Sequence, residues 1–503
     1  MTTVKSPRIP VRLTILPLVL ALGACAFAPD RKPPAAPQPA QYGVQTLPAA
    51  GATAQGVAQR YEQGAQPVPQ WWKRYGSPEL DALVEEGLAK NRTWLPPARS
   101  LAAAREQLRG QINSSLMPSV DAGGEVSRKR ALTMPGLPDP TKLYNIYTGQ
   151  IQARYEVDIF GAARFANEAE SARVEQRAFQ LDSARRALAA NIVTGAIRSA
   201  ALAERVALTE KQAVLSRQVA RDAQRRYELG SASQSEALDA DRDAANLEAS
   251  LPGLYAEWQS TRHALAVLLG RTPDQAPPDL AFGALTLPAH VPVLVPSDLL
   301  ASRPDILAAE TAVRAAAADV GLATAKLFPR LSLTASMGKG GFNWPGALSS
   351  AGSIWGMGAS LTQPIFHGGQ LLAERRAAKL MYEASIEQYK QAVLSAFQDV
   401  ADTLARLEAG SQALAAPESS RRSAEQSYRN TASRVRLGAL APYAGRASEQ
   451  RFISARLAEV QYATQRLTET AALFQAMGSP AQAPAQEPAK EPAKEAAAPA
   501  AQP

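Results

Sequence analysis

This 503-residue chain has few of the residues that usually carry chemistry: it holds one cysteine, three histidines and only 6% aromatic residues. A single cysteine excludes an intramolecular disulfide. His263, His290 and His367 lie far apart, and the chain holds no His-Glu-x-x-His pair, Gly-x-Ser-x-Gly motif or phosphate-binding glycine loop. We therefore expect no enzyme activity, no metal site and no cofactor.

Long hydrophobic runs are also missing. The apolar run Leu13–Leu22 is roughly half as long as a transmembrane helix, and it follows the basic residues Lys5, Arg8 and Arg12. A basic start before a short apolar run is typical of a secretory signal peptide, which we place at residues 1–24.

The signal ends in Leu22-Gly23-Ala24-Cys25. This ending resembles the lipobox of bacterial lipoproteins, in which the cysteine becomes the lipidated first residue, so the resemblance implies lipidation at Cys25. An ordinary signal peptide beside an unrelated cysteine is the alternative. Such lipoproteins tend to stay at the inner membrane when aspartate follows the cysteine, and here Ala26 follows. The resemblance therefore points to the outer membrane.

The two ends of the chain are low in periodic pattern. Residues 25–77 are rich in Pro, Ala and Gln and are expected to form a lipidated tether and an equatorial segment. Residues 479–503 are expected to be disordered. The formal net charge is +8, but basic and acidic residues alternate along the chain, which indicates solvated helix faces and no nucleic-acid partner.

The chain repeats a series of landmarks at an offset of about 208 residues. A Pro follows Met117 and Phe328, an apolar-Gly pair ends at Gly161 and a Gly pair at Gly369, and Leu-Gly occurs at Gly230 and Gly438. Matched breaks in matched order indicate a structural unit duplicated within one chain. We assign residues 78–270 to the first repeat, 298–478 to the second, and 271–297 to an equatorial insert between them.

Each repeat is expected to contain one very long helix, at about 163–229 and 370–437. Both stretches favour helix and lack proline except Pro417, and 67 residues of helix would be about 100 Å long. An apolar seam recurs at spacings of four and three: Val393, Phe397, Val400, Leu404 and Leu407. This pattern predicts coiled-coil-like packing, as in the wall of a tube. A shorter helix follows each long one, and another precedes each strand pair; the N-terminal one, 77–116, is expected to kink at Pro96-Pro97.

Two pairs of strands are expected, at about 119–159 and 331–365. Apolar residues such as Val157, Ile159, Leu331, Leu333 and Leu361 are spaced by two or four, which is typical of strands between lipid and water. Four strands cannot close a membrane barrel, and open edges are not tolerated in lipid. The fold class predicted is therefore mainly α with a small membrane β-barrel, in which three copies give twelve strands and a closed helical tunnel.

Three sequence runs are similar to those of the TolC-like outer membrane factor family, in its lipoprotein branch serving resistance-nodulation-division (RND) efflux pumps. They are Trp71-Trp72 with Ser77-Pro78-Glu79-Leu80, then Ser302-Arg303-Pro304-Asp305, and Leu327-Phe328-Pro329-Arg330-Leu331-Ser332-Leu333. The resemblance covers about residues 70–478. It implies a homotrimeric channel-tunnel in outer membrane lipid that extends into the periplasm. There it would dock with a periplasmic adaptor protein and an inner-membrane RND transporter, as the exit duct for drugs or other small molecules.

In this family, acidic and arginine side chains beyond the two turn glycines close the periplasmic end. Carried over to this chain, the resemblance gives the turn glycines Gly230 and Gly438 and the gate residues Glu236, Asp239, Arg242 and Arg451. The second turn departs from the family pattern, since it is one residue longer and has Ser448 where an aspartate is usual. The alternative is an ordinary solvated helix start, where acidic residues are favoured.

A polar stripe, Asp399, Asp402 and Arg406, runs beside the apolar seam and is a candidate lining of the lumen, or alternatively a solvated outer face. Two other functions remain open. One is a non-conducting periplasmic coiled-coil lipoprotein, which would have no use for the strand pairs. The other is a duct for type I protein secretion or heavy-metal efflux; the seven scattered methionines give the metal duct no support.

Overall fold

The computed structural model describes residues 28–37, 39, 41–43, 53, 56–132 and 141–478. The expected signal peptide, Cys25 and the C-terminal tail therefore lie outside the described residues. The chain divides into two compact units, each assembled from separate parts of the sequence. One is built mainly from Ser100–Arg177 and Ala309–Lys390, and the other mainly from Ala178–Ala308 with segments that precede and follow it.

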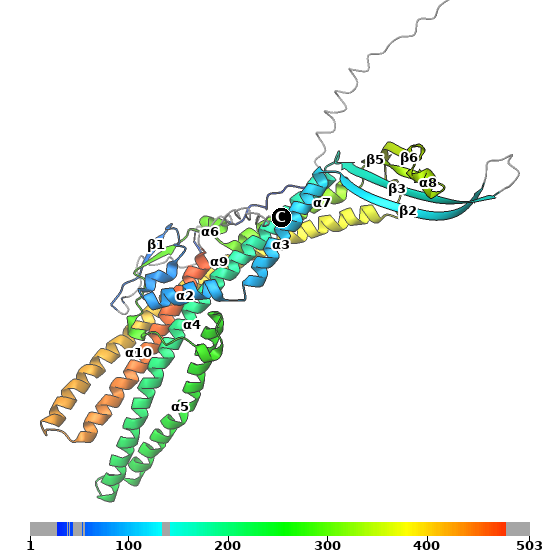
Figure 1. Cartoon of the computed structure of the whole chain (residues 1–503). Coiled ribbons are helices and arrows are strands. Elements are labelled where there is room, and N and C mark those ends of the chain that lie inside the picture. Colours follow the sequence, from blue (N-terminus) through cyan, green and yellow to red (C-terminus); the bar gives the residue numbers. More distant parts are fainter. Residues whose placement is uncertain are drawn as a thin grey trace, which may run out of the picture. The chain divides into compact units, whose positions relative to one another are not determined.

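The same succession of elements occurs twice along the chain (Figure 1). The first series is α3 (Leu95–Leu116), β2 (Ser119–Leu132), β3 (Thr141–Val157), α4 (Ala162–Glu228) and α5 (Gln234–Leu268). The second is α7 (Pro304–Ala325), β5 (Arg330–Gly341), β6 (Ser353–Thr362), α9 (Gln370–Arg436) and α10 (Pro442–Met477). Both long helices have 67 residues, and the helices that follow them have 35 and 36. The internal repeat expected from the sequence is thus present in the fold.

The first unit contains an antiparallel four-stranded sheet in the order β2-β3-β5-β6. β2 and β3 have 14 and 17 residues, whereas β5 and β6 have 12 and 10. A short helix, α8 (Trp344–Leu348), and a 3-10 turn, η5 (Ser350–Gly352), connect β5 to β6. β2 and β6 each pair on one side only within the described residues, so the sheet has two free edges.

The second unit contains a wall of four long helix segments in the order α9-α10-α4-α5 (Figure 1). Ion pairs mark each contact: Arg421–Glu459 at 3.0 Å joins α9 to α10, Lys211–Glu449 at 2.7 Å joins α10 to α4, and Arg217–Glu248 at 2.8 Å joins α4 to α5. The predicted seam is buried, with Val393, Val400 and Leu407 fully inaccessible to solvent. In the part of the chain that the structure describes, every helix is too short or too polar to cross a membrane.

A compact region beside the long helices forms part of the core of the second unit. Here β1 (Arg60–Gln63) pairs in parallel with β4 (His290–Val293), which brings the N-terminal segment onto the equatorial insert. Next to β1, the turn η2 (Trp71–Tyr75) packs on α10, since Trp71 stacks on Phe474 at 5.3 Å and the Tyr75 hydroxyl donates to the Leu467 carbonyl at 2.8 Å. The sequence pattern predicted the insert but not this strand pair.

The expected kink at Pro96-Pro97 is placed differently in the structure. The chain leaves α2 (Pro78–Lys90) at Asn91, whose side chain accepts from the Thr93 amide at 2.7 Å and donates to the Leu268 carbonyl at 2.7 Å. Both prolines fall in the first turn of α3, where a missing N–H removes no helical hydrogen bond. The break therefore comes from a side-chain contact with α5 and not from proline.

The segment before the second strand pair is also interrupted. α6 (Pro296–Ser302) is capped by Arg303, and α7 begins at Pro304. A proline disfavours helical dihedrals at the preceding residue. Arg303 accordingly has an extended backbone conformation, with φ −91° and ψ 122°. Its side chain forms hydrogen bonds with α9 and α10.

Candidate functional site

Both long helices end in the same glycine turn. Gly230 and Gly438 have φ of +73° and +74°, which L side chains rarely adopt. Ser231 N–H donates to the Arg226 carbonyl at 2.7 Å, and Ala439 N–H donates to the Arg434 carbonyl at 2.8 Å, as in a Schellman motif. The turns thus close the α4–α5 and α9–α10 hairpins in the same way, and the two glycines lie where the sequence placed them.

Three of the predicted gate residues lie together on the first turns of α5. Ser233 caps the helix by accepting from the Glu236 amide at 3.2 Å, and the Glu236 carboxylate pairs with Arg226 of α4. One turn on, Arg242 pairs with Asp239 at 3.0 Å and with Asp243 at 3.1 Å. The hydrogen bond from Arg242 to Asp243, together with the charge of Asp239, raises the pKa of Arg242.

The fourth predicted gate residue, Arg451, has a different setting. It is exposed on α10, and its Nε donates to the Ala447 carbonyl at 3.3 Å instead of to a carboxylate. Ser448, at the position where the family pattern has aspartate, is 2% exposed. The structure therefore does not bring Arg451 together with Glu236, Asp239 and Arg242 within one chain.

Sequence reasoning missed four residues that link the two hairpins. The Arg226 guanidinium lies 4.9 Å from the centre of the Tyr443 ring on α10 while it pairs with Glu236 on α5, so it contacts both neighbours of α4. Arg446 of α10 pairs with Asp222 of α4. The signal for Arg226 was present, because it belongs to the repeated landmark before Gly230, but spacing alone does not reveal its partner.

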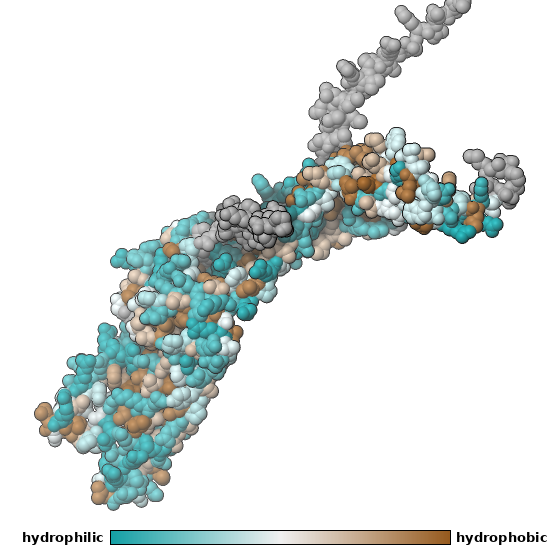
Figure 2. Space-filling view, viewed as in Figure 1, coloured by the Kyte–Doolittle hydropathy of each residue, from teal (hydrophilic) through white to brown (hydrophobic). Residues whose placement is uncertain are grey.

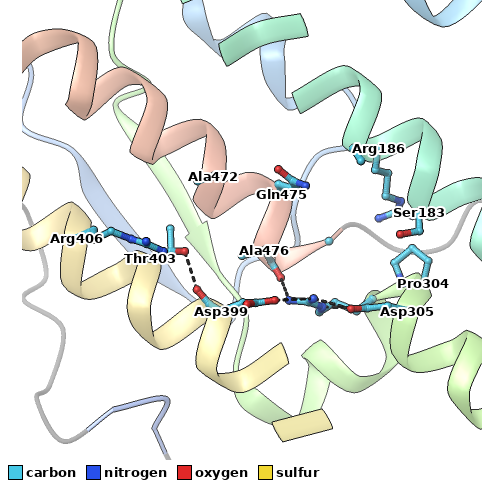
Figure 3. Close-up of a pocket in the computed structure, with 13 residues that line it drawn as sticks. Ser183, Arg186, Pro304, Asp305, Asp399, Thr403, Arg406, Ala472, Gln475 and Ala476 are labelled. Carbon is cyan, nitrogen blue, oxygen red and sulfur yellow. Dashed lines mark hydrogen bonds and ion pairs between the residues drawn. The ribbon is translucent and has the colours of Figure 1, made fainter. Parts of the chain in front are cut away.

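The polar stripe on α9 borders a pocket of about 320 Å³ in the second unit (Figure 3). Asp399 and Arg406 line the pocket with Arg303 and Asp305, whereas Asp402 does not and instead accepts from Gln398 at 3.4 Å. Arg406 and Asp402 are exposed. Two of the three predicted stripe residues thus share one polar cavity.

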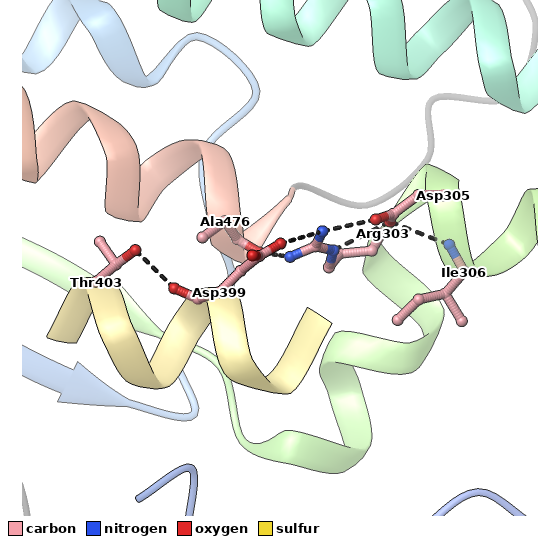
Figure 4. Close-up of polar contacts among 6 residues, drawn as sticks. All are labelled: Arg303, Asp305, Ile306, Asp399, Thr403 and Ala476. Atoms are coloured by element: carbon pink, nitrogen blue, oxygen red, sulfur yellow. Dashed lines mark hydrogen bonds and ion pairs between the residues drawn. The ribbon is translucent and has the colours of Figure 1, made fainter. Parts of the chain in front are cut away.

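Arg303, which the sequence reasoning did not assign, holds this pocket together (Figure 4). Its Nη2 donates to Asp305 at 2.6 Å and to Asp399 at 3.1 Å, while Nη1 donates to the Ala476 carbonyl at 3.1 Å, in the last turn of α10 where helix carbonyls lack partners. We call these four residues the Arg303 clasp. The sequence feature that could have identified Arg303 is the Ser302-Arg303-Pro304-Asp305 run.

Charge and burial act against each other in the Arg303 clasp. The Arg303 side chain is only 12% exposed, and this burial opposes its charge. The hydrogen bonds and charges of Asp305 and Asp399 outweigh burial and raise the pKa of Arg303. Burial also opposes the charge of Asp305 and by itself would raise the pKa of this carboxyl. The bonds of Asp305 to Arg303 and to the Ile306 amide outweigh burial and lower the pKa. Both groups are therefore held in their charged forms.

The four-stranded sheet of the first unit has one apolar and one polar face. Directly paired residues share a face. On one face Ala335 lies between Ala153 and Met357, and on the other its neighbour Ser336 lies between Gln152 and Gly356. The apolar face carries Val120, Val126, Tyr147, Ile151, Tyr155, Val157, Leu331, Leu333, Met337, Trp355 and Leu361. The polar face carries Asp121, Gln150, Gln152, Arg154, Glu156, Ser332, Thr334 and Ser360.

Large apolar side chains on this sheet are exposed. Met357 is 82% exposed, Trp355 79% and Leu361 66%, and Figure 2 shows hydrophobic surface over β5, β6 and α8. A sheet whose apolar face is bare and whose other face is polar is typical of strands that separate lipid from water. The geometry thus supplies a lipid-facing wall in one unit and a charged helical hairpin end in the other.

Comparison with known proteins gives a consistent result. The family described as outer membrane efflux protein matches residues 83–271 and 295–479. The pyoverdine export outer membrane protein OpmQ of Pseudomonas putida is 30% identical over 403 residues, 79% of this chain and 82% of that protein. The probable efflux pump outer membrane protein TtgC of Pseudomonas putida is 29% identical over 478 residues, 93% of this chain and 95% of its own.

The fold has a close counterpart among solved structures. The outer-membrane channel OprN superposes with a TM-score of 0.77 at 25% sequence identity, over 90% of this chain and 99% of that one. The family match leaves out residues 272–294, which contain the whole of β4 and therefore its pairing with the N-terminal segment.

Proposed function

Since the chain belongs to the outer membrane efflux protein family, it is the outer membrane exit duct of an efflux pump, and we propose that three copies form the conduit. The two-faced sheet with free edges at β2 and β6 carries this proposal. An open edge leaves backbone groups unpaired in lipid, at a cost of several kcal/mol each. Pairing β6 of one copy with β2 of the next removes that cost and puts all polar faces on one inner surface.

The helical wall supports the same assembly. Within the described residues α9 and α5 each have a long-helix neighbour on one side only, so α5 of one copy is available to α9 of the next. The charged hairpin ends would then form a ring. There the duct would meet a periplasmic adaptor and an inner-membrane RND transporter, which supplies the energy, while this chain supplies the passage.

The gate of this conduit is proposed to lie at the hairpin ends, with Glu236, Asp239 and Arg242 from the first hairpin and Arg451 from the second. Arg226 would hold the gate closed, because it contacts Glu236 and Tyr443 on the helices to either side of α4. Opening would separate the two hairpins and break these contacts. Asp399, which belongs to the Arg303 clasp, is proposed to face the lumen together with Asp402 and Arg406.

Channel recordings test the gate. Arg226→Ala and the double variant Asp239→Ala/Arg242→Ala should each conduct more ions at rest than the unchanged protein, because fewer contacts hold the hairpins closed. Arg217→Ala is the matched control, since Arg217 pairs α4 with Asp241 and Glu248 of α5 but forms no ion pair with a residue of α10 within the described chain. Conductance equal to that of the control in both variants would remove these residues from the gate.

The proposed cargo is a class of small molecules, as the name of OpmQ, a pyoverdine exporter, and that of TtgC, an efflux pump protein, suggest for those relatives. Lipidation at Cys25 is proposed as an additional anchor in the outer membrane. Mass spectrometry of the purified mature protein would test it, since loss of residues 1–24 with diacylglycerol on Cys25 is the expected product and an unmodified cysteine would exclude it.

A further inference from the structure

The apolar face of the sheet ends in a pair of arginines. Arg128 and Arg130 lie on β2 at positions that pair with Asn145 and Leu143 of β3, two and four residues beyond the Val126–Tyr147 pair. Both are therefore on the same face as Val126, Ile151 and the rest of the apolar surface. They lie toward the β2–β3 hairpin, away from the strand ends that join α3 and α4.

The distance along β3 fits one membrane thickness. Ten residues separate Val157, at the start of the apolar face, from Tyr147, which is about 34 Å of strand and about 26 Å along the normal for a strand tilted by ~40°. Membrane barrels carry an apolar band of about 25 Å with aromatic residues at its rims. Tyr147 lies 5.1 Å from Trp344, so an aromatic pair marks the outer rim, and Arg128 and Arg130 follow directly beyond it.

Two other basic groups near this end of the sheet, Lys129 and Lys339, are already engaged, and Lys142 lies on the opposite, polar face. Lys129 belongs to the opposite, polar face and pairs with Glu125 at 3.6 Å. Lys339 shares the face of the arginines, but its Nζ donates to the Leu348 and Ser349 carbonyls at 3.1 and 2.8 Å. Arg128 and Arg130 are exposed, and neither makes an ion pair or hydrogen bond with another described residue. Figure 2 shows hydrophilic surface at this end of β2 and β3.

We propose that Arg128 and Arg130 bind the phosphate groups of lipids in the outer leaflet. The proposal rests on the proposed placement of the sheet in the membrane, which puts both guanidinium groups at headgroup depth. A guanidinium binds phosphate oxygens through two parallel hydrogen bonds, and two arginines two residues apart on one strand face can hold one or two headgroups. Bound lipid would fix the depth of the hairpin and shield the cationic pair from its copies in a closed barrel.

Lipid competition tests the proposal with the full-length protein. In vesicles of phosphatidylcholine with brominated phosphatidic acid, quenching of Trp344 and Trp355 reports phosphatidic acid beside the sheet. Brominated phosphatidylcholine gives the reference. We expect the unchanged protein to prefer phosphatidic acid by about thirtyfold, since each of the two cationic residues near a membrane surface contributes ~1 kcal/mol toward anionic lipid. Arg128→Gln/Arg130→Gln should lose most of that preference, and Lys129→Gln, on the other face, should keep it.

Three outcomes would overturn the inference. They are an unchanged preference in the double arginine variant, an equal loss in Lys129→Gln, and loss of the preference on adding inorganic phosphate at the concentration of the lipid, which would indicate a free-anion site. Single-channel conductance of the same variants separates this inference from the proposed function. If the parent and the double variant both conduct and show equal lipid preference, lipid binding is refuted and the proposed function stands. If the parent forms no channel, the proposed function is refuted.

Discussion

Arg303 shows how one side chain joins three segments of the second unit. It contacts Asp305 at the start of α7, Asp399 on α9 and a carbonyl at the end of α10. Removing it leaves Asp305 partly buried without its cation and a helix carbonyl without a donor. Because the carboxylates are 43% and 56% exposed, we discount the effect expected of a fully buried pair.

Arg303→Ala is therefore expected to lower the stability of the folded protein by about 1–3 kcal/mol, measured as a decrease in the midpoint of thermal unfolding in detergent. Part of the loss depends on pH. The folded pKa of Asp305 is lowered, so its contribution is present above its ordinary pKa of 3.8 and is lost as pH falls through the folded value. The gap between parent and variant should narrow in acid. Arg406→Ala, an exposed arginine of the same pocket, should change the midpoint little, and an equal effect of both would contradict the role of the clasp.

Glu469 on α10 presents the opposite case. Burial raises its pKa, while a hydrogen bond from Gln465 and the charges of Arg466 and Arg406 oppose this effect. A carboxyl whose folded pKa exceeds its ordinary value of 4.5 stabilises the fold below that value and loses this contribution as pH rises through the folded pKa. The ionised group is thus unfavourable at neutral pH.

Glu469→Gln is predicted to raise the unfolding midpoint at pH 7.5, with a smaller gain at pH 4.5, because the raised pKa keeps more of the native carboxyl protonated there. Differential scanning calorimetry at the two values measures this. Glu408→Gln on α9, at a less buried carboxyl, serves as the matched substitution. A lower midpoint for Glu469→Gln at pH 7.5 would show that attraction to Arg466 outweighs burial.

At the scale of elements, periodicity over long stretches was a reliable guide. The long helices expected at 163–229 and 370–437 extend over Ala162–Glu228 and Gln370–Arg436, because helix-favouring residues and terminal glycines act locally. Strands were found where apolar residues alternate. The register that sorts them into two faces follows from the same alternation, since a slip of one residue would exchange the faces.

Features that depend on distant partners were not predictable. The end of α2 is fixed by the bond from Asn91 to Leu268, and β1 and β4 are four-residue strands that pair across more than 200 positions of sequence. The candidate site has the same limitation. The family resemblance pointed to Glu236, Asp239 and Arg242, but the contacts of Arg226 with Tyr443 and of Arg303 with Asp399 arise only when separate helices pack.

The two faces of β5 lead to a paired prediction at this scale. Ala335→Lys puts a cation on the apolar face beside Ala153 and Met357, which costs about 2–4 kcal/mol near the middle of a bilayer, so assembly in the membrane should fall sharply. Ser336→Lys, one residue on, should assemble normally and shift ion selectivity toward anions. Heat-modifiable migration on gels measures assembly and reversal potentials measure selectivity. The reverse pattern would mean that the faces are misassigned.

At the scale of the whole molecule, each unit is incomplete at its edges. The sheet lacks partners at β2 and β6, and the helical wall lacks long-helix partners at α9 and α5, within the described residues. Each unit of the duplicated chain has two open edges. Joining further copies of the chain supplies the missing strand and helix partners. Neither edge is explained by a rod-like scaffold that conducts nothing, because a scaffold needs no bare apolar sheet.

Single-channel recording of the purified full-length protein in a planar lipid bilayer tests this account most directly. We predict discrete, long-lived conductance steps that appear only when the protein is assembled and that increase in size or open time in Arg226→Ala. A folded protein that enters the bilayer but passes no current, both unchanged and as Arg226→Ala, would contradict the account. A folded protein that stays monomeric and passes no current would contradict it as well.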